Sequence, residues 1–537
     1  MKISKITIFS SLLMLLIAAT NTSCSDKLDL GPIDYYGSES YWKTEAHAEG
    51  YIDGIHKHLR DAAWQHTIVF GELRGGHYIT GTSGDGSSVS GGAIASQNFD
   101  ANNTGVTMFG NTFGRITNLN LFIARVTDAD FIGEEKKNYF LGIVHGLRAF
   151  YYVDLYRIYG GVPLRLGVEV IDGELDPTQL YMPRATPAEV MTQIKSDLQK
   201  SLEYFGNVNN FNPYGMGSKV YWNKAATESL MGEVYLWNSK VTTGNNTANQ
   251  ADLAVAKQHL LNVVNNYGLS LQNNFADVFD ATKKANSEII FAIRFAENEA
   301  TNNFNSYVYN IGTGQTTNSS YLEDSTLFVD PLQLAGAGTM QRYEYKEELF
   351  RIFDVEDSRR DATFLAAYYK NDEGNLVYRG THVRKNIGLI NSSGIRIFIG
   401  DMPFYRLSWV YLTLAEIANM EGDNAKVEEY INLVRERAYG ENWAPEFEFE
   451  AGDFTTNELA ILAEKDKEFV QEGQRWWDLR RMTLTKGGKP LVFTQQASFN
   501  GAPILNESTE AHKVLWPLDR GLLDNDDALE QTPGYES

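Results

Sequence analysis

The 537-residue chain is poor in several features that mark large classes of protein. A single cysteine excludes any disulfide within the chain, and prolines number only 13, as expected of an ordered globular protein. Basic residues are outnumbered by acidic ones, 47 against 69, so the net charge is -22. Affinity for nucleic acid comes largely from Lys and Arg that neutralise phosphates, and we therefore expect no nucleic-acid partner.

Long apolar runs are also missing, apart from one short stretch near the N-terminus. Lys2 and Lys5 precede an apolar run at 6–19, which is too short to cross a hydrocarbon core of about 30 Å as a helix but suits a secretory signal. Cys24 follows where a signal peptidase would cut. We expect residues 1–23 to be a lipoprotein signal peptide and Cys24 to be acylated, which anchors the mature chain to a membrane. The alternative is a leftover thiol beside the cleavage site.

Helices are indicated where apolar residues recur at helical spacing between capping signals. The apolar period of 139–159 stops at a Gly-Gly-Val-Pro sequence at 160–163, and Thr186 with Glu189 forms a capping box before another periodic stretch. Further helices are expected at 223–240, 250–267, 404–421, 424–439 and 456–482, the last opened by a second capping box of Thr455 with Glu458.

Two pairs of these helices, at 223–267 and 404–439, resemble each other. The second helix of each pair ends on a Tyr-Gly sequence, at Tyr267 and at Tyr439. Units of two helices and about 34 residues have the size of tetratricopeptide repeats. The sequence therefore predicts a mainly α fold, with tetratricopeptide-like helical repeats as the scaffold and little β structure.

Three long excursions interrupt the helical pattern, at 66–115, 296–345 and 368–402. They are rich in Gly, Asn, Ser and Thr and show no sustained apolar period. Because long ordered loops on a rigid frame often carry binding sites, we expect these segments to be functional rather than linkers. Disorder is the alternative for 81–95.

Five stretches follow one another in an order that matches a known family, together with the signal around Cys24. They are GLRAFYYVDL (146–155) with its stop at 159–163, NSEIIF (286–291), YRL leading to AEI (405–417), EGQRWWDLRR (472–481), and LWPL with QTPGY (515–535). With them, the chain resembles the SusD/RagB-like family of glycan-binding lipoproteins of the bacterial outer membrane. The resemblance runs the length of the chain.

This resemblance implies one SusD-like domain over 24–537 that captures oligosaccharides or polysaccharides and passes them to a SusC-like TonB-dependent transporter. It further implies a lipid-anchored protein of the cell outer membrane, facing the exterior, without catalysis, cofactor or metal. In the family the stretch at 475–481 is mostly architectural. Adjacent side chains on a helix point about 100° apart, so Trp476 and Trp477 cannot both lie flat on one ligand, and we expect them in the core.

Groups for catalysis are not evident in the sequence. It has no His-Glu-x-x-His zinc signature, no Gly-x-Ser-x-Gly elbow and no phosphate-binding loop, and His56 and His58, two residues apart, point to different faces of a helix. A pair of glycosidase carboxylates is defined by separation in space, which a sequence does not reveal. A surface-anchored glycoside hydrolase therefore stays open as an alternative, as does a structural helical-repeat adaptor without a sugar site.

A sugar ring has an apolar face and a rim of hydroxyls, so its site needs exposed aromatics and polar side chains. In the family the loops that correspond to 66–115 and 296–345 commonly converge on one shallow glycan site. Phe99 and Tyr321 could instead anchor the loops, and Arg74 could pair with Glu72. The candidate binding residues are Glu72, Arg74, His77, Tyr78, Asn98, Phe99 and Asn102 in the first loop, and Tyr307, Tyr309 and Tyr321 in the second.

Overall fold

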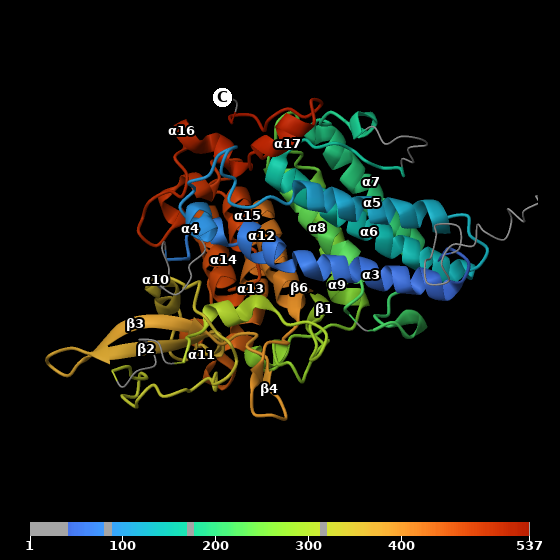
Figure 1. The fold of residues 1–537 in the computed structure, drawn as a ribbon. Helices are drawn as coiled ribbons and strands as arrows, with labels where there is room; N and C mark the ends of the chain where they lie inside the picture. Colours follow the sequence, from blue (N-terminus) through green and yellow to red (C-terminus); the bar gives the residue numbers. More distant parts are fainter. Residues whose placement is uncertain (1–40, 80–88, 169–176, 218, 312–318, 536–537) are drawn as a thin grey trace, which may run out of the picture.

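The computed structural model describes residues 41–79, 89–168, 177–217, 219–311 and 319–535 (Figure 1). The predicted signal peptide and Cys24 lie outside the described residues, as do residues 81–88 of the glycine-rich stretch. Within the described ranges helices predominate and strands are short. The prediction of a mainly α fold is confirmed.

The N-terminal half is a set of packed helices, drawn in blue to green in Figure 1. Its central element is α6, in which every residue from 139 to 159 is buried against α5, α7 and α8. Gly160, with a φ of 78°, ends α6 where the sequence predicted. The helices of this half are α3 (Glu45–Trp64), α4 (Val89–Ala95), α5 (Phe109–Val126), α6 (Glu134–Tyr159), α7 (Pro187–Phe205), α8 (Lys224–Lys240) and α9 (Asp252–Asn266).

The predicted capping box opens α7. The Thr186 hydroxyl accepts a hydrogen bond from the Glu189 N–H at 3.3 Å, and the Glu189 carboxylate accepts one from the Thr186 N–H at 2.8 Å. Pro187 takes the first helical position, where its missing N–H costs nothing. The local sequence is therefore sufficient to set the start of this helix.

The C-terminal half is also helical, with one correction to the predicted elements. The single helix expected at 456–482 is two helices, because the chain between them turns through left-handed φ angles at Gln471 and Gly473. Asp453, rather than Thr455, caps the first of them by accepting from the Thr456 N–H at 2.8 Å. The elements are α10 (Glu347–Arg351), α11 (Ser358–Thr363), α12 (Leu407–Glu421), α13 (Asn424–Tyr439), α14 (Phe454–Glu468), α15 (Arg475–Arg481), α16 (Glu507–Glu510) and α17 (Arg520–Asn525).

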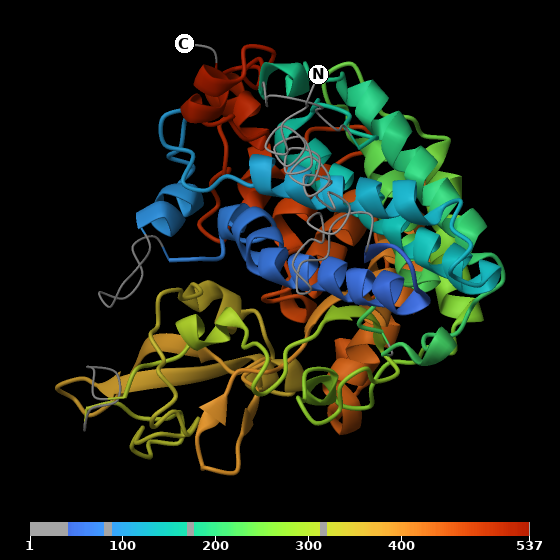
Figure 2. The same cartoon turned by 45° about the vertical axis from the view of Figure 1, so that its right-hand side comes forward.

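Both predicted helix pairs are present. α8 packs on α9, α12 packs on α13, and α9 in turn contacts α12, so the two pairs are neighbours in space although about 140 residues separate them in sequence. The long segment between them folds as a separate lobe, drawn in yellow and orange below the helices in Figure 2. The scaffold is thus a helical repeat with one large insertion.

Strands occur mainly in this lobe and are antiparallel. β1 pairs with β6 at the junction with the helices, while β2 and β3 form a hairpin with a bulge after Ala367. The region at 368–402, which the sequence indicated to be a loop, therefore contains most of the β structure. The strands are β1 (Ile289–Ile293), β2 (Phe364–Lys370), β3 (Leu376–Val383), β4 (Leu389–Ile390), β5 (Arg396–Ile397) and β6 (Met402–Arg406).

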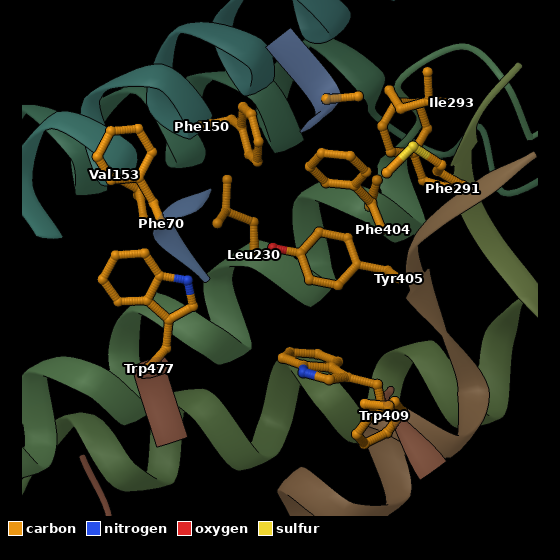
Figure 3. Close-up of a cluster of buried hydrophobic side chains, with 14 of the residues drawn as sticks. Phe70, Phe150, Val153, Leu230, Phe291, Ile293, Phe404, Tyr405, Trp409 and Trp477 are labelled. Carbon is orange, nitrogen blue, oxygen red and sulfur yellow. The ribbon is translucent and has the colours of Figure 1, made fainter. Parts of the chain in front are cut away.

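An aromatic core joins the helices to the β1–β6 pair. In Figure 3 the rings of Phe150 from α6 and Phe404 from β6 are neighbours that meet edge to face, with Phe291 of β1 and Trp477 of α15 further out. The Phe150 and Phe404 ring centroids are 5.4 Å apart. Trp476 and Trp477 are 1% and 4% exposed, so the prediction that both belong to the core is confirmed.

A buried ionic network runs through the same interface. Arg406 at the end of β6 donates to Glu288 at 2.9 Å, to Glu468 at 2.6 Å and to Glu472 at 2.7 Å. Its partners come from the residue before β1 and from the α14–α15 region, so the network fixes these segments against one another. A second network is built in the same way around Glu416, which pairs with Lys240, Lys465 and Arg481.

Candidate functional site

The two loops that the sequence singled out lie side by side. Tyr78 and Tyr345 form an isolated antiparallel bridge, flanked by hydrogen bonds from Ile79 N–H to the Glu344 carbonyl at 3.0 Å and from Lys346 N–H to the His77 carbonyl at 2.8 Å. The first loop approaches this bridge from the end of α3, where residues 65–70 form a π-helical turn. We call this region the loop junction.

A chain of hydroxyl groups holds the loop junction together from inside. The Tyr78 hydroxyl is 3.1 Å from that of Tyr307 and donates to that of Tyr345 at 2.8 Å, and Tyr345 donates to Glu72 at 2.7 Å. Glu72 also accepts from the backbone N–H groups of the 471–473 turn, at 3.1 and 3.4 Å. Burial raises the pKa of Glu72 to about 7, although these donors act in the opposite direction.

Arg74 and Phe99 are framework residues of the first loop. The Arg74 guanidinium lies 3.8 Å from the centre of the Trp476 ring and donates to Gln97 at 2.7 Å, so its partner is not Glu72. The Phe99 ring stacks on Trp516 with 4.4 Å between centroids. These contacts bring the first loop onto α15 and the C-terminal segment.

His77 and Tyr309 are internal for similar reasons. The His77 ring stacks on Phe499 with 5.2 Å between centroids, and its Nε2 lies 3.7 Å from the Asp466 carboxylate. The Tyr309 hydroxyl donates to Asp330 at 2.6 Å and accepts from the backbone N–H of residue 332. Both side chains are therefore enclosed by the protein itself.

Most of the sequence-predicted binding residues are therefore buried, which corrects the expectation that they line an exposed surface. The aromatic residues of these loops pack into the hydrophobic core that the helices also share. A fully buried ring offers no face to a sugar. The buried candidates are Glu72, Arg74, His77, Tyr78, Phe99, Tyr307 and Tyr309, all at most 5% exposed.

The other three candidates reach the surface in different places. Asn98 and Asn102 are exposed, and Asn102 accepts a hydrogen bond from Arg520 of α17 at 3.5 Å. Tyr321 is half-buried beside β2, where it pairs with Tyr368 and its ring lies 4.3 Å from the Lys370 ammonium. The structure does not gather the three into one cluster around the loop junction.

Sequence reasoning missed the two aromatic residues that form the outer edge of the loop junction. Trp64 and Tyr343 are both half-buried, with 5.5 Å between their ring centroids, and each packs on the buried Tyr307 ring, at 5.7 and 5.4 Å. Trp64 is the last residue of α3, two positions before the predicted loop began, so the boundary at residue 66 left it out. Nothing in the sequence distinguished Tyr343 from its buried neighbour Tyr345.

A cleft of about 420 Å³ lies along the same helix, and we call it the α3 cleft. Tyr221 donates to Asp53 at 2.5 Å, Arg60 pairs with Glu299, and Arg294 donates to Asp401 at 2.9 Å. The lining residues are Asp53, His56, Lys57 and Arg60 of α3, Val220 and Tyr221 before α8, and Ile293, Arg294 and Glu299 at and after the end of β1.

His56 and His58 of α3 are not arranged for catalysis or metal binding. His56 is half-buried and uses both ring nitrogens, one with the Ile52 carbonyl at 2.8 Å and one accepting from the Trp222 N–H at 2.9 Å, whereas His58 is exposed. The two therefore point to different faces, as predicted. In the ranges that the structure describes, no cluster of three or more His, Cys, Asp or Glu side chains is arranged to hold a metal ion.

Membrane-spanning helices were sought as well. Among residues 41–535, leaving aside the gaps in the description, no helix combines the length and the apolar character that crossing a bilayer requires.

Comparison with known proteins identifies the fold. Residues 369–535 match the SusD family. A crystal structure of a SusD superfamily protein from Bacteroides fragilis is 63% identical, covers 92% of this chain and all of that one, and superposes with a TM-score of 0.87.

More distant relatives extend this result. A SusD-like protein of Formosa agariphila is 22% identical over 97% of this chain and 98% of its own length. The starch-binding protein SusD of Bacteroides thetaiotaomicron is 24% identical over 78% of this chain and 77% of its own length. The last of these is named as a binding protein and not as an enzyme. With a full-length relative at 63% identity, the chain belongs to the SusD family.

Proposed function

We propose that this protein binds glycans at the cell surface and captures oligosaccharides or polysaccharides for uptake. The observation that carries the proposal is its membership of the SusD family, in which one relative is named a starch-binding protein. The acidic composition and the lack of catalytic motifs in the sequence agree with a binding role.

Delivery to a SusC-like TonB-dependent transporter is the second part of the proposal. A capture protein that works beside a transporter has to stay at the membrane, and acylation of Cys24 would supply that attachment. We therefore place the mature chain on the outer membrane, facing the exterior.

The outer edge of the loop junction is the surface that we propose as the glycan platform. Trp64 and Tyr343 lie on a rigid base, because Tyr307 beneath them is tied through Tyr78 and Tyr345 to Glu72. Preorganised rings lose little conformational freedom when a ligand arrives.

The expected affinity follows from the area of such a platform. Stacking a sugar face on one ring buries on the order of 100 Å² of apolar surface, worth roughly 2.5 kcal/mol at about 25 cal/mol per Å². Two rings give about 5 kcal/mol before ordering costs, and each hydrogen bond at the rim adds only about 0.5–1.5 kcal/mol because it replaces one to water. Dissociation constants should therefore lie near the micromolar to millimolar boundary, which suits a site that must release its cargo.

A panel of immobilised glycans tests the function. The mature protein should be retained on at least one glycan, and the glycan should be recovered at its original size. Products of cleavage would instead identify a hydrolase, and neither retention nor products would identify a structural adaptor.

Variants test the location of the platform. Trp64→Ala and Tyr343→Ala should each weaken retention by roughly tenfold or more, because each removes about half of the apolar contact, roughly 2.5 kcal/mol before ordering costs. Tyr369→Ala is the matched control, because Tyr369 is 43% exposed on β2, away from the loop junction. If the control lost as much affinity as the two variants, or if the two variants bound like the wild type, the platform would lie elsewhere. Thermal melting of each variant checks that it is folded.

A further inference from the structure

The α3 cleft is formed by residues that do not belong to the loop junction. Its volume of about 420 Å³ falls in the range of small-ligand pockets, about 300–1,000 Å³. Three separate segments form its walls, namely α3, the residues before α8, and the chain at and after the end of β1. A cleft that is made by elements distant in sequence is held open by the fold itself rather than by one loop.

The floor of the cleft is apolar and uncharged. Ile293 and Val220 contribute aliphatic surface, and the half-buried Tyr221 ring meets the His56 ring with 4.7 Å between centroids. Burial lowers the pKa of His56 to about 4, with partial compensation from its hydrogen bond to Ile52, so this imidazole is neutral at pH 7. A flat ligand with an apolar face can therefore rest on these side chains, and the charge nearest to the Tyr221 ring is the Asp53 carboxylate that accepts from its hydroxyl.

The three cations at the rim of the cleft each already have a carboxylate partner. Arg60 is paired with Glu299, Lys57 with Asp61 at 2.7 Å, and Arg294 with Asp401 at 2.9 Å. An anionic ligand would have to compete with a resident carboxylate for each cation. A neutral ligand with several hydroxyl groups can donate to the carboxylates and accept from the cations, and it leaves the pairs intact.

The cleft and the proposed platform lie along one face of α3. Asp53, Lys57, Arg60 and Trp64 follow one another at spacings of four, three and four residues, which places them on one side of a helix. At 1.5 Å per residue the stretch from Asp53 to Trp64 is about 16 Å long, more than one sugar ring can occupy.

We propose that the α3 cleft is a second sugar-binding site, which takes a neutral pyranose ring with its apolar face on Tyr221 and its hydroxyls on the charged pairs of the rim. The chemical class of the ligand rests on the proposed function, whereas the location rests on the cleft. An oligosaccharide long enough to reach Trp64 would engage both sites.

Nuclear magnetic resonance of isotope-labelled isoleucine methyl groups tests this site directly. Ile293 lies in the floor of the cleft, and its methyl signal is assigned through the Ile293→Val variant. Methyl glucopyranoside is the neutral probe, with the methyl glycosides of galactose and mannose as further neutral probes. The methyl glycoside of glucuronic acid is the matched anionic probe, because it differs from the glucoside by one carboxylate.

The expected result is a saturable shift of the Ile293 signal with a neutral glycoside and a smaller response to the glucuronide. Arg294→Gln should weaken this response roughly two- to tenfold, the effect of one lost hydrogen bond. Lys426→Gln is the control, since Lys426 is an equally paired surface cation on α13. Trp64→Ala should leave the response to a single ring unchanged.

Two results would overturn the proposal. No shift of Ile293 with any neutral glycoside would exclude the site, and retention of the same protein on glycan surfaces would show that the proposed function survives without it. A stronger response to the glucuronide than to the glucoside would show that the cleft selects anions. If the wild-type protein gave the Ile293 response but was not retained on any glycan surface, the result would count against the proposed function and the platform and not against the cleft.

Discussion

Two buried carboxyl groups give the stability of the folded protein an unusual dependence on pH. Burial raises the pKa of Glu72 and of Glu344 from 4.5 to about 7, and backbone hydrogen bonds offset only part of this rise. A raised pKa means that the folded chain binds the proton more tightly than the unfolded chain. The stabilisation is fully present below pH 4.5 and is lost as the pH rises through 7.

Glu344→Gln tests this dependence. Glu344 is 9% exposed, and Gln has nearly its shape without its charge, so the variant should lose clearly less stability between pH 5 and pH 8 than the wild type does. The loss that remains comes from Glu72. The difference between the two pKa values corresponds to roughly 3 kcal/mol. Melting curves at several pH values measure it, with the exposed Glu373→Gln as control. Equal pH dependence of Glu344→Gln and wild type would refute the assignment.

Acidic groups of the buried networks act in the opposite sense. Burial alone would raise the pKa of Glu468, but Arg437, Arg406 and Arg359 hold it well below its usual range. Stability that depends on this carboxylate is lost as the pH falls below about 4.5 towards its depressed pKa. Glu468 therefore loses its contribution towards acid pH, whereas Glu72 and Glu344 lose theirs as the pH rises through neutrality.

Replacing Trp476 tests whether this residue stabilises the fold or binds the ligand. It is 1% exposed and packs under the Arg74 guanidinium, so Trp476→Ala should lower the free energy of unfolding by about 3–5 kcal/mol. Glycan binding by the folded variant should be unchanged. A variant that melted like the wild type but failed to bind would place the ligand on the helical scaffold, and the platform at the loop junction would be wrong.

The break between helices α14 and α15 depends on a close contact between two glycines, Gly71 and Gly473. Gly473 has a φ of +72°, and a Cβ there would lie 2.5 Å from the Thr67 carbonyl oxygen, while a Cβ on Gly71 would lie 2.1 Å from the Gly473 oxygen. The turn therefore needs both a left-handed residue and a missing side chain. This close contact brings the loop junction against the helical scaffold.

Gly473→Ala and Gly487→Ala form a matched pair of variants. Comparing them distinguishes the cost of a left-handed φ from the cost of a side chain in a close contact. Gly487 has a similar φ of +68° but open space around the position of a Cβ, so its replacement should cost only the backbone strain, about 1–2 kcal/mol. Gly473→Ala should cost clearly more, because backbone atoms of Thr67 must also move. Urea unfolding of the two variants measures the difference. Equal losses would mean that the contact with Thr67 is unimportant.

Local signals in the sequence predict helices well and their interruptions poorly. Gly160 ends α6, and Thr186 opens α7 as expected, because both effects involve only neighbouring residues. The break near Gly473 depends instead on Thr67, four hundred residues away, and no local pattern contains that contact. For the same reason the sequence did not reveal the strands β2 and β3 in a region rich in turn residues.

The candidate site was the least predictable part. Aromatic residues in a loop can face outward or inward, and the composition is the same in both cases. Tyr307 and Tyr345 became the inner support, and Tyr343 became part of the surface, through contacts between loops that are far apart in sequence. The sequence indicated the two loops that meet at the loop junction, but it did not indicate which of their aromatic residues are exposed.

The whole molecule explains why the family motifs indicate the fold and not the ligand. Glu288, Arg406, Glu416, Glu472 and Arg481, which belong to the motifs that carry the resemblance, are members of the buried ionic networks. Removing one partner of such a pair leaves an uncompensated charge in the interior, so these positions tolerate little change. The surfaces proposed for sugars, by contrast, consist of residues outside these motifs.

The proposed attachment to the membrane concerns the whole molecule, and the proposal rests on Cys24, outside the described residues. Each buried methylene of an acyl chain adds about 0.8 kcal/mol to the free energy of membrane binding. Two or three acyl chains therefore hold a protein stably on the membrane, and a protein without them is not held. Cys24→Ala should therefore yield a released form or an unprocessed precursor in fractionated cells. Protease treatment of intact cells should digest the wild type if it faces outward. Retention of the variant on the membrane at wild-type size would contradict lipid anchoring, because no acyl chain could then account for the attachment.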